Sequence, residues 1–161
     1  MIIFDSFIHW LHLMAAVTWI GGMIFTSFVL QPVMRVLLKP QERMPLYYEM
    51  GKKFKVIQFV CLLVLLATGL QKLWQLRDSP AIFHSSFGNI LAVKLILVLA
   101  VLVLSVCHSF IWGPQLTALR NEPESPIFQQ LISKMVFWGR LNMTLAVAIV
   151  FCATLLRFNP F

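Results

Sequence analysis

The chain has 161 residues, of which 60% are hydrophobic and only 12% are charged, and its formal net charge is +7. Soluble domains are nearer half apolar and a quarter charged, so a soluble protein of this size could not cover so much apolar surface. The basic residues lie at helix ends and in loops, without the basic and aromatic run of a nucleic-acid surface, so we expect no nucleic-acid partner.

Four apolar stretches follow one another along the chain, each of the ~20 residues that an α-helix needs to cross the hydrocarbon core. We therefore predict an all-α fold, an integral membrane four-helix bundle that forms a single domain over residues 1–161. The expected spans are 7–30, 56–76, 89–112 and 137–156. Turn-forming and helix-breaking residues separate them, at Gln31-Pro32, Lys39-Pro40, Asp78-Ser79-Pro80, Gly113-Pro114 and 121–126.

The first span begins without Lys or Arg and no small-residue cleavage site follows it, so we expect it to remain as a helix. His9, His12 and Trp19 share one face of this helix by the 3.6-residue period. His9 is near enough to the surface to contact lipid headgroups. His12 lies a turn deeper, where a polar group is costly, so a ligand role is favoured for it.

The third span carries Lys94 and His108 on one face, about 21 Å apart along the helix axis. Lys94 could instead extend to the headgroups, and His108 could be a hydrogen-bonded core residue. Arg140 and Asn142 open the fourth span. The guanidinium fork of Arg140 suits a carboxylate such as a haem propionate.

Basic residues are distributed unequally between the two ends of the spans. The first and third loops, with Arg140 at the edge, hold nine Lys and Arg residues, whereas the opposite side holds Lys72, Arg77 and Arg157. By the positive-inside rule we expect both termini on the periplasmic side of a bacterial inner membrane.

That orientation places the polar groups at two levels. His12 and Lys94 lie at an outer level, where His9 or His84 could join them, and His108 and Arg140 lie at an inner level. The two ligand atoms of a bis-axial haem are only about 4 Å apart. We therefore expect that His12 and His108 do not bind the same iron.

The segment 11–25, with its His-Leu-Met-Ala-Ala core and Gly-Gly pair, resembles the opening helix of the CopD family of small bacterial inner-membrane proteins. The same resemblance extends over nearly the whole chain through further short motifs. These are Gly51-Lys52-Lys53-Phe54, Ala67-Thr68-Gly69-Leu70, Cys107-His108 ahead of Gly113-Pro114, and Gly139-Arg140-Leu141-Asn142. Membership of this family would imply handling of copper at the inner membrane.

The CopD family is in turn similar to the HemJ-type protoporphyrinogen oxidases, which bind b-type haem and rely on a first-helix His and a third-helix Lys. Those positions match His12 and Lys94 here. The HemJ type follows its fourth-helix Arg and Asn with a Glu, where this chain has Met143. This departure weakens the expectation of oxidase activity and leaves haem binding open.

We therefore expect a b-type haem-binding membrane protein with a redox or electron-transfer role, of which a haem-dependent oxidoreductase would be one form. The candidate cofactor-binding residues are His12, Lys94, His108 and Arg140. The candidate metal ligands are His12, His108, His9 and His84. Beyond the lipid bilayer, the expected partners are a redox protein or further copies of the chain.

Two other functions remain open. Copper handling would suit an outward group of Asp5, His9, His12 and His84 as ligands of Cu(II), although the eight methionines are scattered along the chain. A non-catalytic membrane subunit would use its intramembrane polar residues only to bond helices together. The residues available for that are Lys94, Ser105, Asn142 and Thr144.

Overall fold

The computed structural model describes residues 2–77, 85–119, 122 and 125–158, and among these it contains helices and no strand. Four helical runs are long and apolar enough to cross a membrane. They are Ile2–Leu37, Gln41–Leu76, Ser86–Ala118 and Pro126–Phe158. The expected all-α class with four spans is confirmed, and the chain is a multi-pass membrane protein. It divides into two compact units, Met1–Ser79 and Pro80–Phe161.

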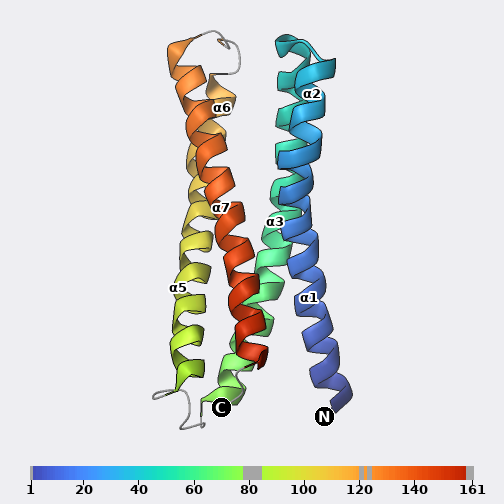
Figure 1. Ribbon diagram of the computed structural model, residues 1–161. Helices are drawn as coiled ribbons and strands as arrows, with labels where there is room; N and C mark the ends of the chain where they lie inside the picture. The colour runs from blue at the N-terminus through green and yellow to red at the C-terminus, as the bar shows by residue number, and fades with distance from the viewer. Residues whose placement is uncertain (1, 78–84, 120–121, 123–124, 159–161) are drawn as a thin grey trace. The chain divides into compact units, whose positions relative to one another are not determined.

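The first unit is an antiparallel pair of helical runs (Figure 1). Its elements are α1 (Ile2–Phe25), the π-helical turn η1 (Thr26–Leu30), α2 (Gln31–Leu37) and α3 (Pro40–Leu76). The α1 helix packs along α3. The expected break at Lys39-Pro40 is confirmed, because Pro40 starts α3 and the Lys39 backbone N–H donates to the Glu42 carboxylate at 3.0 Å.

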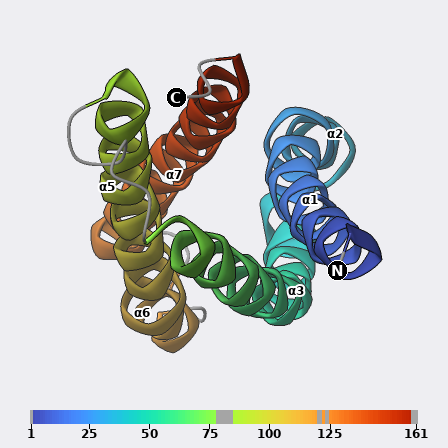
Figure 2. The same cartoon turned by 90° about the horizontal axis from the view of Figure 1, so that it is seen from below.

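The second unit repeats this order of elements. It contains α5 (Ser86–Val106), the π-helical turn η2 (Cys107–Trp112), α6 (Gly113–Ala118) and α7 (Pro126–Phe158), with α7 lying along α5 (Figure 2). Serine side chains cap the two long helices. The Ser85 hydroxyl accepts from the Gly88 N–H and the Ser125 hydroxyl from the Phe128 N–H, each at 3.2 Å.

The breaks expected at Gln31-Pro32 and Gly113-Pro114 are wrong, since the helix continues through both. A proline lacks the N–H that would bond the preceding turn, and its ring collides with that turn's carbonyl. A π-helical turn precedes each proline, and the helix continues through it. The residue before the proline donates to the carbonyl five positions back, Gln31 to Thr26 and Gly113 to His108. The expected break at 78–80 lies outside the described residues.

The helices are longer than the apolar spans. The run Ile2–Leu37 has 36 residues, or about 54 Å at the rise of an α-helix, against about 30 Å of hydrocarbon. Most basic residues assigned to the first loop, such as Arg35 and Lys53, therefore lie on helices. Lys72 is also not a loop residue, because it belongs to α3.

Candidate functional site

Three polar pairs join α1 to α3 along one seam. His12 contacts Thr68, His9 contacts Lys72, and Asp5 contacts Gln75. The α1 partners are three or four residues apart, and so are the α3 partners, as expected for two helices that meet along one face each. The face predicted to carry His9 and His12 is therefore the face of α1 that contacts α3. We call the row of three polar pairs the polar seam.

The pair of His12 and Thr68 determines which nitrogen of the His12 ring carries a hydrogen. His12 Nδ1 lies 2.6 Å from Thr68 Oγ1, and the Thr68 hydroxyl lies 2.6 Å from the backbone carbonyl of Val64. A hydroxyl carries one hydrogen, which the carbonyl can only accept. Thr68 Oγ1 therefore accepts from the Nδ1–H of His12, and in the neutral ring the lone pair then lies on Nε2.

Thr68 is a buried residue, with 5% of its surface exposed. It bonds the carbonyl of the turn before it, as Thr does inside helices. Next to it, a side chain at Gly69 would lie 4.0 Å from His12 Cε1. The imidazole thus rests directly over the α3 backbone at Gly69, and both its position and its tautomer are set by α3.

The second pair, His9 and Lys72, is separated by 2.7 Å between Nδ1 and Nζ. An ammonium group has donors and no acceptor, so Lys72 donates and His9 accepts. His9 is then neutral, with its hydrogen on Nε2. Two histidines one turn apart on α1 therefore carry opposite tautomers.

The third pair completes the seam at the end nearest the N-terminus. The Gln75 side-chain amide donates to Asp5 Oδ1 at 3.3 Å. Sequence reasoning missed Thr68, Lys72 and Gln75 as partners. Their spacing of four and three residues indicates that they share one face of an apolar helix. The spacing does not indicate which face of α1 that helix face contacts.

At its other end the α1–α3 seam is closely packed and apolar. Ala15 and Trp19 are buried. Gly22 lies so near Phe54 that an added Cβ would be 2.5 Å from the ring carbon Cε2. Gly22 therefore lets the two helices approach, as small residues do in membrane helices.

In the second unit, α5 and α7 meet through a buried hydrogen bond. The Asn142 amide donates to Ser105 Oγ at 3.2 Å, and both residues are buried. His108 lies in η2, about one turn beyond Ser105, and its Nε2 would lie 3.9 Å from a side chain placed at Gly139. His108 thus packs against the α7 backbone.

Aromatic side chains extend this contact past His108. The Trp112 and Trp138 rings stack with centroids 5.9 Å apart, and the His108 ring meets Trp112 edge-on at 6.2 Å. The Lys134 ammonium lies 5.3 Å from the centre of the Trp112 ring, within the range of a cation–π contact. Stacked aromatic rings therefore join η2 to α7 at this end of the unit.

The expected inner group is only partly brought together. Asn142 is buried at the α5–α7 contact and His108 lies one turn away. Arg140 is exposed, because two positions along a helix turn its side chain about 200° from that of Asn142. Lys94 lies on α5, partly exposed. His84 falls outside the described residues.

The outward metal cluster does not assemble from the residues that the structure describes. Asp5, His9 and His12 each contact a different residue of α3. Within the described ranges, no three His, Cys, Asp or Glu side chains come close enough to hold one metal ion.

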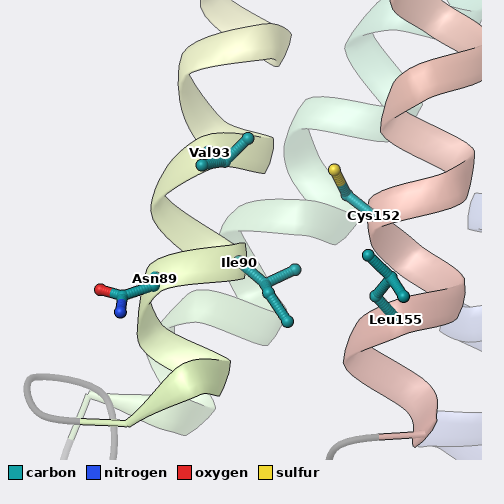
Figure 3. Close-up of a pocket in the computed structure, with 5 residues that line it drawn as sticks. All are labelled: Asn89, Ile90, Val93, Cys152 and Leu155. Atoms are coloured by element: carbon teal, nitrogen blue, oxygen red, sulfur yellow. The ribbon is translucent and has the colours of Figure 1, made fainter.

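An apolar groove of about 210 Å³ lies between α5 and α7 near Asn89. Figure 3 shows Ile90 and Leu155 pointing toward each other across it, with Cys152 above, whereas the Asn89 amide points away. The groove is lined by hydrocarbon and a thiol, so it is an ordinary apolar surface of a membrane helix pair.

The two units, each a pair of packed helical runs, define the class of the protein. It is a small all-α membrane protein with polar residues along its helix contacts. Residues 14–125 match DUF4149, a domain of unknown function, and the chain belongs to this family. The matched segment includes Thr68, Lys72 and His108 and begins two residues after His12.

A protein of Aquifex aeolicus (strain VF5), which carries the description "uncharacterized protein", is 28% identical over 158 residues. The alignment covers 98% of each chain, so the two proteins correspond over nearly their full lengths. No solved structure gives a significant match.

Proposed function

We propose that this chain is a b-type haem-binding membrane protein with a redox or electron-transfer role in the bacterial inner membrane, with His12 as an axial ligand. The observation that carries the proposal is the hydrogen-bond chain from His12 Nδ1 through Thr68 to the Val64 carbonyl. Histidines that bind metals donate their other ring N–H to a fixed acceptor in this way. Nε2 then carries the lone pair that would bind iron.

Gly69 presents no side chain to the His12 ring, which lets the imidazole pack close to α3. Haem would supply one-electron chemistry, and the residues of this chain would hold and orient it. The resemblance to the HemJ type makes Lys94 the proposed third-helix ligand. His108 and Arg140 are retained as candidates for a separate inner site.

Topology and partners belong to the same proposal. The basic residues at the Leu38–Lys39 end support a cytoplasmic location for that end, with both termini outside. A haem in such a protein exchanges electrons with another molecule, so a redox protein or a further copy of this chain is the proposed partner.

One observation favours a second candidate, a non-catalytic membrane subunit. The buried bond between Asn142 and Ser105 joins α5 to α7 through two polar residues. Copper handling gains no such support, because Asp5 and His9 are each bonded to their own α3 partner.

The absorption spectrum of the protein purified in mild detergent tests the proposed function. We expect a Soret band and reducible α and β bands, which His12→Ala removes while Lys53→Met, at an exposed position of the same unit, retains them. A colourless protein that carries stoichiometric copper, or one without either cofactor, would contradict the proposal.

A further inference from the structure

Lys72 is a cation near the end of a membrane-spanning helix, and its described partner is neutral. Its ammonium donates to His9 Nδ1 at 2.7 Å. The nearest acidic residue of the seam, Asp5, accepts instead from Gln75. Among the residues that the structure describes, Lys72 has no carboxylate partner. A charge on a membrane-spanning helix is costly unless an opposite charge or water meets it.

The geometry leaves Lys72 able to bind an anion. An ammonium has three hydrogens, and the bond to His9 uses one of them. That bond also restrains the long side chain, which lowers the entropy that a further contact would cost. Lys72 thus has two donors that a carboxylate can accept.

The position of Lys72 relates it to His12. Lys72 follows Thr68 by four residues, so the two share a face of α3 and are about 6 Å apart along its axis. Thr68 holds His12 on that same face. A ligand bound at His12 Nε2 would therefore have a cation one turn toward the membrane surface.

We propose that Lys72, held by His9, binds a propionate carboxylate of the haem at His12, a proposal that rests on the haem function above. A b-type haem is amphipathic, with an apolar macrocycle and two carboxylates at one edge. His12 lies deeper in the seam and Lys72 nearer the surface, which matches that polarity. The exposed Arg140 of the second unit is not the residue that this site uses.

Binding of haem and of its dimethyl ester to the full chain, freed of haem in detergent, tests this assignment. The ester keeps the iron and macrocycle and lacks both carboxylates. We expect Lys72→Met to weaken haem binding roughly tenfold, the effect of losing a partly buried charge-assisted bond, and to leave ester binding unchanged. Lys53→Met removes an exposed lysine from the same helix and should change neither affinity.

Lys72→Gln is the second variant, since it retains a donor without the charge, and should show the same selective loss. Equal weakening of haem and ester, or no change in either, would overturn the assignment of Lys72, and a lysine that only reaches lipid phosphates gives the latter result. Failure of the unaltered chain to bind either compound would instead overturn the proposed function itself, and this assignment with it.

Discussion

Individual side chains on α3 decide what the histidines of α1 can do. Thr68 accepts from His12, whereas Lys72 donates to His9, at 2.6 and 2.7 Å. The same residue type therefore carries its lone pair on different nitrogens one helical turn apart. Only His12 has Nε2 as the basic nitrogen, which is why the proposed ligand is His12 and not His9.

Variants of Thr68 should separate the contribution of its hydrogen bond to haem affinity from the contribution of its packing. Thr68→Val keeps the shape and removes the acceptor for His12 Nδ1–H, so we expect a loss of about 10- to 100-fold in haem affinity. Thr68→Ser retains the hydroxyl and should bind haem nearly as well as the parent. Titration of the purified variants with haem measures both. Equal affinity for the valine and serine variants would show that the hydroxyl does not hold the ligand.

The candidate site could be predicted from the sequence only on one side of the seam. The helical period and the cost of a polar group at depth single out His12. Its partner could not be found, because hydrophobic periodicity does not fix the register between α1 and α3. The sequence pattern predicts Lys72 in the second loop. In the structure it lies on α3 and contacts His9.

At the scale of elements, both units place a π-helical turn before a proline and then continue as a helix. The turns are Thr26–Leu30 and Cys107–Trp112. The four spans could be predicted from the length of their apolar runs. The continuation through Gln31-Pro32 could not, because proline ordinarily breaks a helix, and the compensating turn depends on backbone bonds five residues apart.

Adjacent glycines on α1 provide a matched test of the close contact between α1 and α3. A Cβ at Gly22 would lie 2.5 Å from Phe54, whereas nothing lies within 4 Å of one at Gly21. Gly22→Ala should destabilise the protein by about 1 kcal/mol, at the low end for overpacking because the Phe54 ring can shift. Gly21→Ala should be neutral or stabilise by up to ~1 kcal/mol, as alanine favours helix.

Thermal unfolding in detergent measures the difference between these two variants. The expected order of midpoint temperatures is Gly21→Ala at or above the parent, with Gly22→Ala below it. The reverse order would mean that α1 and α3 do not meet at Gly22 and Phe54.

At the scale of the whole molecule, basic residues are distributed unequally along the long apolar helices. Six of the eight lysines and arginines of the first unit lie between Arg35 and Lys55, on α2, the Leu38–Lys39 turn and the first half of α3. This arrangement follows from the cost of moving basic residues across a membrane, and it underlies the proposed topology.

Labelling of single cysteines with a membrane-impermeant maleimide tests that topology, after the three native cysteines are replaced with alanine. Lys39→Cys should be protected in intact cells stripped of their outer membrane and become labelled once the inner membrane is opened. Ser6→Cys should be labelled in both states. Labelling of Lys39→Cys from outside would invert the proposed orientation.

The central claim, that His12 Nε2 binds haem iron, is tested most directly by chemical rescue. His12→Gly leaves a space where the imidazole lay, so free imidazole can take its place on the iron. We predict that the purified variant loses the α and β bands of the reduced protein and that millimolar imidazole restores them. An unaltered spectrum in His12→Gly, with no response to imidazole, would show that His12 is not the ligand.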